Sequence, residues 1–564
     1  MSHKPESTVT RGAIAAGAGC FVLSIVYITQ VFTRYLVNDD YQILYTAWLK
    51  STNLVPGRDY AITSYHLLVD VLAPLFRLFP DSLVTLYLAR IFNFVVLVSI
   101  AALLFDIARR LFGWYAGLTA PLLALGTGAM LHRGMDVRPD LLTTALWLFI
   151  IRGIMQPVRM SPARLGLLGL VAGLATVNRF KAGIVIPFLA VGILLRVAAS
   201  SPHGRLRHAI SSLAIAAGAA AGVLCLYALL IFQFDDVYTF VKTHLALARD
   251  ISHSWRGDPR WRTLSSALAL DPIFWLLSGS GLVLALLRSS PNRPWVRETS
   301  IGLVALSLVS ILSNPAYYAY NLVTLIPLCA PLAAAPFGLG LEALARAGSS
   351  RCLAIATPIL LSISVLQQPL ILDHYLFTPT NRHQKALVEF IRKSTRADAA
   401  VFAFEGVGLF RPSTRHWRIS EIILNRYYRG EFTVRDELCV VKPELIVASY
   451  RVPAWLTAED KRYLEERFVP LSFGLLVPGH IGEGEFELMV DGQYEAIAWQ
   501  SQCRFDGEET RHGEVLNLTA GIHRIEGENC AVRRYYPASA LVDLNPKRLP
   551  YLVPPELTTF GGGW

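Results

Sequence analysis

The sequence contains few charged residues for its length. Charged side chains make up 17% of the 564 residues, whereas about a quarter is typical of a soluble globular protein. The deficit lies in residues 1–375, which hold long apolar runs. The last of these runs ends at Leu372. Residues 376–564 have the composition of an ordinary soluble domain. A single soluble fold is therefore excluded, and residues 1–375 are predicted to form a membrane domain.

The sequence also lacks the motifs of nucleotide and metal sites. It contains no P-loop, no GxGxxG after a predicted strand, and no CxxC pair among its seven cysteines. Its net charge of +10 comes largely from one to three arginines between apolar runs, which is typical of polytopic membrane proteins. No nucleic-acid partner is predicted. Cys503 and Cys530 flank a strand-rich stretch and would pair if that stretch faces an oxidising compartment.

Eleven apolar runs are predicted to cross a membrane as helices, since about 20 apolar residues span a bilayer. The first run is too long for the apolar segment of a signal peptide, so we interpret it as an uncleaved span. The fourth, fifth, sixth and ninth runs are short. The predicted spans are residues 14–35, 83–105, 114–131, 141–155, 163–178, 182–197, 208–232, 272–288, 299–313, 318–337 and 352–371.

Basic residues orient these spans. If the N-terminus is cytoplasmic, every inner connection carries arginine, which is the positive-inside pattern. An odd number of spans then places residues 376–564 on the outer side of the membrane. The inner arginines are Arg109, Arg110, Arg152, Arg159, Arg164, Arg196, Arg205, Arg207, Arg288, Arg293, Arg297, Arg346 and Arg351.

The outer connection between the first two spans, residues 37–82, is far longer than a turn requires. It opens with Asp39 and Asp40 directly at the membrane exit, ahead of an amphipathic helical pattern at residues 41–49. Aspartates favour helix N-termini, so a helix cap is one interpretation of this acidic pair. A functional site is the other interpretation.

Two further outer connections, residues 132–140 and 178–181, carry charges where a few turn residues would suffice. Ion pairs within a loop and snorkelling to lipid head groups are the structural interpretations. Charges at membrane depth are costly, however, and usually have partners or a function. Their position on the same side as the acidic pair favours a site. The charged residues are Arg133, Asp136, Arg138 and Asp140 in the first connection, and Arg179 and Lys181 in the second.

The order of these motifs resembles the GT-C class of membrane glycosyltransferases, especially the group with protein O-mannosyltransferases and aminoarabinose transferases. Four features of that class have counterparts: an acidic pair, a turn with Gly, Asp and Tyr, an Arg/Asp cluster, and a late aromatic-led span. Asp40 stands where Glu is common, and Asn321 where a charged residue is common. The matching segments are Asp39-Asp40-Tyr41-Gln42, Gly57-Arg58-Asp59-Tyr60, Arg138-Pro139-Asp140 and Tyr317-Tyr318-Ala319-Tyr320-Asn321.

The resemblance implies transfer of a sugar from a polyprenyl-phosphate donor to a glycan, lipid or protein acceptor at the outer membrane face. It makes Asp39 the general base by motif position, with Asp40 assisting it or binding a metal and Asp140 as a third catalytic residue. No cofactor is required by the residues, although Mg²⁺ or Mn²⁺ stays open. The substrate-binding residues are Arg58, Asp59, Asp136, Arg138, Arg179, Lys181 and Tyr320, with Arg138, Arg179 and Lys181 holding the lipid phosphate.

Together with the orientation, the resemblance implies an integral protein of the bacterial inner membrane, in contact with membrane lipids. Its N-terminus is then cytoplasmic and its C-terminal region periplasmic. A polymerase or ligase of lipid-linked glycans shares this topology and is the main alternative. A transporter of lipid-linked sugars would need charges within the spans and internal repeats, which the sequence does not show.

The C-terminal region divides at residue 470 in the sequence. Residues 376–470 show an α/β pattern, with strands predicted at 399–404 and 445–449 and helices at 421–428 and 458–468. Residues 471–564 carry short strands between turns, such as 485–490 and 521–526, which is typical of a β-sandwich. The sequence therefore predicts three domains: a GT-C-like membrane domain at 1–375, an α/β region at 376–470 and a β-rich domain at 471–564.

Overall fold

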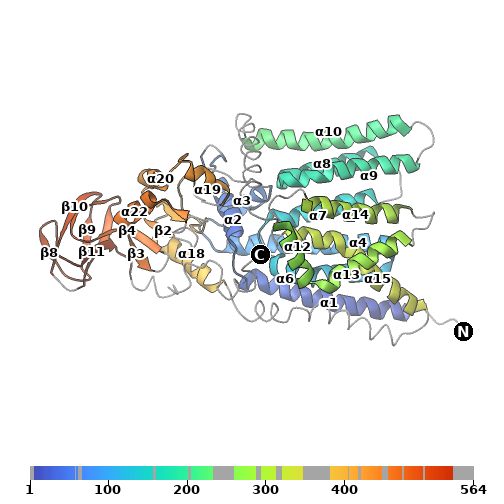
Figure 1. Cartoon of the computed structure of the whole chain (residues 1–564), viewed down its shortest axis with the longest axis horizontal. Coiled ribbons are helices and arrows are strands. Elements are labelled where there is room, and N and C mark those ends of the chain that lie inside the picture. Colours follow the sequence, from blue (N-terminus) through green and yellow to red (C-terminus); the bar gives the residue numbers. More distant parts are fainter. Residues whose placement is uncertain are drawn as a thin grey trace.

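The chain forms a helical bundle and a C-terminal domain that lie at opposite ends of the molecule (Figure 1). Helices α2, α3 and α18 lie between these two parts. The computed structural model describes residues 6–56, 59–60, 67–155, 160–200, 205–232, 259–287, 294–312, 321–346, 381–403, 406–416, 421–447, 455–472, 475–499 and 502–537.

The long helices of the bundle run roughly side by side (Figure 1). Each of the first ten predicted spans coincides with a helix, and the eleventh, residues 352–371, lies outside the described residues. These helices are α1 (Glu6–Thr33), α4 (Val84–Phe112), α5 (Trp114–Leu125), α7 (Pro139–Ile154), α8 (Pro162–Asn178), α9 (Val185–Ser200), α10 (Arg205–Phe232), α13 (Pro272–Leu287), α14 (Pro294–Leu312) and α15 (Leu322–Arg346).

Length and apolar composition qualify three of the described helices to cross a membrane on their own. These segments are Val84–Phe112, Arg207–Leu230 and Leu322–Ala343. Several other helices are apolar but shorter, among them Pro162–Asn178 and Pro272–Leu287. The structure therefore agrees with a polytopic helical domain, whereas the number of eleven spans and their orientation stay predictions.

Small residues allow the bundle helices to pack closely. A Cβ atom added to Gly169 of α8 would clash with the Ala216 carbonyl oxygen of α10. One added to Gly281 of α13 would clash with the Leu332 carbonyl oxygen of α15. Such close backbone contact is typical of helices that associate without a hydrophobic driving force between them.

One hydrophobic core joins the bundle to the C-terminal domain. It contains Leu44 of α2 (Asn38–Ser51), Leu72 of α3 (Leu67–Leu78), Leu387 of α18 (Arg382–Ser394) and Leu445 of β2 (Leu445–Val447). The apolar faces of the amphipathic helices α2 and α3 are therefore buried between the two parts of the molecule. This packing fixes the orientation of α2, on which the acidic pair lies.

The C-terminal domain contains a seven-stranded sheet in the order β1-β2-β4-β11-β6-β9, with β3 paired to β4. Strands β1 and β2 are parallel, and β4 runs antiparallel to β2. Short helices accompany the sheet: α19 (Glu421–Tyr428), α20 (Val434–Val441) and α22 (Ala458–Arg467). The strands are β1 (Val401–Ala403), β2, β3 (Phe468–Ser472), β4 (Leu475–Ile481), β6 (Gly492–Ala498), β9 (Val515–Leu518) and β11 (Cys530–Arg534).

A second, four-stranded sheet has the order β5-β10-β7-β8. Its Phe486 and Ile525 pack with Tyr494 and Val532 of the first sheet, so the two sheets enclose a common core as the sandwich pattern predicts. The predicted boundary at residue 470 falls inside β3, because β3 and β4 extend the α/β sheet into the sandwich. These strands are β5 (Gly484–Leu488), β7 (Cys503–Phe505), β8 (Glu508–Thr510) and β10 (Gly521–Glu526).

Cys503 and Cys530 form a disulfide across 27 residues, which confirms the pairing that the sequence left open. Closing a loop of this length stabilises a fold by about 3–4 kcal/mol in the chain-entropy treatment. We expect Cys503→Ser/Cys530→Ser to make the two sheets susceptible to limited proteolysis in the detergent-purified full chain. Cys439→Ser, which removes an exposed free thiol, should not. Equal cleavage of both variants would show that the disulfide contributes little.

Candidate active site

Asp40 joins two of the predicted outer connections. Its carboxylate accepts hydrogen bonds from the backbone N–H of Val37 at 3.1 Å and of Val137 at 2.7 Å. The first bond caps the N-terminus of α2, and the second attaches the segment that leads into α7. Burial raises the pKa of Asp40, the nearby Asp136 charge adds to the increase, and Arg90 and Arg34 oppose it.

Buried ion pairs surround Asp40. Arg34 binds Asp136 at 2.6 Å, with both side chains fully enclosed, and Arg90 lies 4.0 Å from Asp40. Arg90 also donates to the carbonyl oxygens of Arg34 at 2.6 Å and Tyr35 at 2.7 Å, where α1 ends. Because buried charges are tolerated only when they are paired and hydrogen-bonded, this layer fixes the end of α1 relative to α4 and α7.

A second set of charged side chains begins at Asp39 and continues away from this buried layer. Arg138 binds Asp39 through Nη1 and Asp140 through Nε, the latter at 3.2 Å. Arg179 binds the other oxygen of Asp140 and donates to Asn321 Oδ1 at 3.3 Å. Asp39 is 34% exposed, whereas Asp140 is only 3% exposed. Asp39 is therefore the accessible carboxylate of this charged chain, which we define as Asp39, Arg138, Asp140, Arg179 and Asn321.

Asn178, the last residue of α8, brings three of the contributing elements together. Its side-chain oxygen accepts from the Leu68 amide of α3 at 3.2 Å. Its side-chain nitrogen donates to the Pro139 carbonyl at 2.8 Å and the Thr143 hydroxyl at 3.0 Å, both in α7. The fully buried amide thus places Arg179, the next residue, beside Asp140.

A small, partly open pocket lies at the end of the charged chain. Arg179 and Lys181 supply positive charge to it, and hydroxyl, amide and apolar groups complete its wall. Desolvation lowers the pKa of Lys181 to about 8, helped by the nearby Arg179 charge and opposed by Asp140, although the residue as a whole is exposed. The lining residues are Thr143, Trp147, Arg179, Lys181, Ala182, Ile184, Ser310, Asn321 and Thr324.

The remaining predicted site residues lie elsewhere or outside the described part. Asp136 belongs to the buried layer rather than to the pocket. Asp59 accepts a hydrogen bond from the Val55 amide at 2.7 Å, within its own turn. Arg58 and Tyr320 lie outside the described residues.

The described residues do not assemble a metal site. They contain no cluster of three or more His, Cys, Asp or Glu side chains that could hold an ion. Both oxygens of Asp40 accept backbone N–H groups and Asp39 binds Arg138, and a divalent cation at this acidic pair stays a prediction.

Sequence reasoning did not identify Arg34, Arg90 or Asn178. A signal was present for the two arginines, because both lie at the outer ends of predicted spans, where the positive-inside pattern does not place them. Arginines buried in such places usually have an acidic partner. For Asn178 no comparable signal exists, since a single amide at a helix end is common.

We expect the two adjacent aspartates to differ in their effect on stability. Asp40→Ala leaves the buried Arg90 without its counter-ion, and breaking such a pair costs about 3–5 kcal/mol. Asp39→Ala removes a partly exposed contact that is worth at most about 1 kcal/mol. Unfolding of the purified variants in detergent measures both changes. Equal stability of the two variants would contradict the structural assignment of Asp40.

No protein-family model and no curated protein sequence matches this chain. Solved structures do match it. The apo oligosaccharyltransferase of Archaeoglobus fulgidus aligns with a TM-score of 0.52 at 12% identity, over 90% of this chain and 74% of its own. ArnT from Cupriavidus metallidurans aligns in its apo state with a TM-score of 0.52 at 12% identity, over 82% and 98%. ArnT bound to undecaprenyl phosphate aligns with a TM-score of 0.50 at 12% identity, over 70% and 85%. The chain therefore has the fold of GT-C glycosyltransferases, as its motifs predict.

Proposed function

We propose that the chain is a glycosyltransferase that moves a sugar from a polyprenyl-phosphate donor to an acceptor at the outer face of the membrane. The observation that carries this proposal is the charged chain, which links an accessible carboxylate to a pocket with two cations. The GT-C fold supports it, as does the complex of ArnT with undecaprenyl phosphate. In this proposal, residues 376–564 are periplasmic and the membrane is the bacterial inner membrane.

The pocket suits the phosphate group of a lipid-linked donor. Arg179 and Lys181 would form charge-assisted hydrogen bonds to the phosphate oxygens. These bonds strengthen as negative charge develops on the leaving group, so they lower the barrier more than they stabilise the bound donor. Asn321 and Thr324 add neutral polar groups to the same wall. The apolar side chains Trp147 and Ile184 reduce hydration around the phosphate.

Asp39 would act as the general base. The acceptor hydroxyl loses its proton to Asp39 as its oxygen bonds to the anomeric carbon, and the bond from that carbon to the phosphate oxygen breaks. The phosphate leaves with the electron pair, and the anomeric carbon is inverted. Arg138 holds Asp39 in place and connects it to Asp140. Asp140 acts as a positioning residue, because both of its oxygens bind guanidinium groups.

The acceptor is a glycan, a lipid or a protein. The oligosaccharyltransferase of Archaeoglobus fulgidus has been solved with a tethered acceptor peptide, and it aligns with a TM-score of 0.50 at 11% identity. That structure supports an acceptor site in this fold without identifying the acceptor of this chain. Asp39 is the accessible group of the charged chain, so we expect the acceptor hydroxyl to approach from its side.

The test is sugar transfer by the purified full chain, with radiolabelled polyprenyl-phosphate monosaccharides as donors and host membrane extract as acceptor. We expect transfer from one donor by wild type and a loss of roughly a hundred- to ten-thousandfold in Asp39→Asn. The matched control is Asp398→Asn, which removes an exposed carboxylate of the C-terminal domain and should retain activity. Near-wild-type transfer by Asp39→Asn would refute the base. Transfer from lipid-linked oligosaccharides alone would favour the polymerase or ligase alternative.

The low pKa of Lys181 predicts a pH dependence of donor binding. Lys181 is an ammonium below about pH 8 and loses its charge as the pH rises further. We therefore expect KM for the donor to rise between pH 7 and pH 9 in wild type. In Lys181→Arg the charge persists across this range, so the rise should be much smaller. An identical rise in both proteins would assign the effect to another group.

A further inference from the structure

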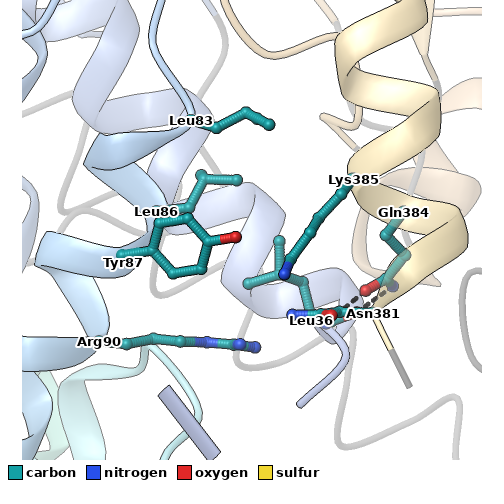
Figure 2. A pocket seen from close by; sticks show the side chains of 8 residues that line it. All are labelled: Leu36, Leu83, Leu86, Tyr87, Arg90, Asn381, Gln384 and Lys385. Carbon is teal, nitrogen blue, oxygen red and sulfur yellow. Dashed lines mark hydrogen bonds between the residues drawn. The ribbon is translucent and has the colours of Figure 1, made fainter. Parts of the chain in front are cut away.

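A second, small pocket lies where the bundle meets the C-terminal domain. Figure 2 shows its lining, with one wall from α4, another from α18, and the end of α1 between them. The buried layer of Arg34, Asp136, Arg90 and Asp40 belongs to the same junction. The lining residues are Leu36, Leu83, Leu86, Tyr87, Arg90, Asn381, Gln384 and Lys385.

Hydrogen bonds hold the walls of this second pocket together. The Gln384 side chain accepts from the Leu36 amide at 2.6 Å and donates to the Leu36 carbonyl at 2.7 Å. Asn381 Nδ2 donates to the Phe32 carbonyl at 2.9 Å, and Lys385 Nζ donates to the same oxygen at 3.0 Å. The start of α18 is thus fixed to the end of α1, so the pocket is a built feature of the junction.

The polar groups of the second pocket are suited to an anion. Arg90 is 2% exposed, and its Nε has no hydrogen-bond partner in the described part of the chain. Figure 2 shows Arg90 and the Tyr87 hydroxyl extending from α4 toward Lys385 and Asn381. The ammonium of Lys385 lies 5.1 Å from the centre of the Tyr87 ring. Two cations and a phenol therefore face one space, and an unsatisfied buried donor is costly until a ligand satisfies it.

One buried acceptor in the second pocket restricts the ligand further. Asn381 Oδ1 also has no hydrogen-bond partner among the described residues. Inorganic phosphate and a phosphodiester that carries a hydroxylated head group both offer acceptors to Arg90 and Lys385 and an O–H donor to Asn381. The surface around the pocket distinguishes between them.

Apolar surface continues from the second pocket along the bundle. On α1, Ile28 and Phe32 are exposed, and on α4, Val84 and Ile91 flank Tyr87 and are exposed as well. The rings of Phe32 and Tyr87 lie 5.6 Å apart and connect the two apolar strips. The pocket lies at the outer ends of the first two predicted spans, which is the depth of lipid head groups. Acyl chains would cover the strips below it.

We propose that this second pocket binds the phosphate head group of an anionic membrane lipid, such as a phosphatidylglycerol, as a structural ligand. Lys385, Arg90 and Tyr87 bind the phosphate, Asn381 accepts a head-group hydroxyl, and the acyl chains lie on α1 and α4. The site is separate from the candidate donor pocket, which contains Arg179 and Lys181, and it does not depend on the proposed transferase activity.

The experiment is native mass spectrometry of the full chain in neutral detergent, titrated with phosphatidylglycerol or with phosphatidylcholine. We expect wild type to bind phosphatidylglycerol more tightly, and Lys385→Gln to weaken that binding about tenfold, the loss of one charge-assisted hydrogen bond. Tyr87→Phe, which removes one hydroxyl, should weaken it severalfold. The matched control is Lys393→Gln on the same helix, which removes an exposed ammonium and should have no effect.

Two further measurements show whether the bound phosphate belongs to a lipid in this pocket, to a lipid in the donor pocket or to inorganic phosphate. Lys181→Gln, at the candidate donor pocket, should leave phosphatidylglycerol binding unchanged, and millimolar inorganic phosphate should not displace the lipid. Equal binding of the two lipids, unchanged binding in both Lys385→Gln and Tyr87→Phe, or displacement by inorganic phosphate would each overturn the proposal. A loss in Lys181→Gln in place of Lys385→Gln would assign the lipid to the donor pocket and overturn it as well.

Discussion

The structure of the junction between the bundle and the C-terminal domain depends on one buried carboxylate. Asp40 accepts amide hydrogens from Val37 and Val137, two residues far apart in the sequence, and it lies beside Arg90. Neither amide has water to bond to at this depth, and Arg90 would be an uncompensated buried charge without Asp40. The end of α1, the start of α2 and the segment before α7 are therefore held in one arrangement. Asp39 and Arg138 lie on or next to two of these segments, and Arg179 is connected to them through Asp140.

Two adjacent aspartates have different environments for a simple geometric reason. Consecutive side chains on a helix point about 100° apart, so Asp40 faces the interior of the junction when Asp39 faces Arg138. Asp40 is enclosed and serves the fold, whereas Asp39 is partly exposed. The helix-cap interpretation of the acidic pair thus describes Asp40, and the functional interpretation is proposed for Asp39 alone.

Much of the candidate site was predictable, because charged side chains at the edge of a membrane are costly and usually have partners or a function. Arg138, Asp140 and Arg179 lie in two connections that the sequence places on one side, and the structure brings them into contact with Asp39. The motif position already favoured Asp39 as the base. The structural role of Asp40 was not predictable, because it depends on the amide of Val137, a distant residue without a distinguishing side chain. The role of Asn178 was not predictable for the same reason, because it depends on the three distant groups to which its side-chain amide is hydrogen-bonded.

The C-terminal domain was predicted as a separate unit, yet its contacts make it part of the site's support. Arg411 is buried there and binds Asp81, in the segment between α3 and α4, at 3.1 Å. The carbonyl oxygen of Arg411 accepts from the Tyr45 hydroxyl of α2 at 3.0 Å. Since α2 also carries Asp39, the domain holds the middle of this helix while Asp40 holds its N-terminus. A helix that is held at two points keeps Asp39 at a constant position relative to Arg138, and constant geometry of this kind is what the proposed proton transfer requires.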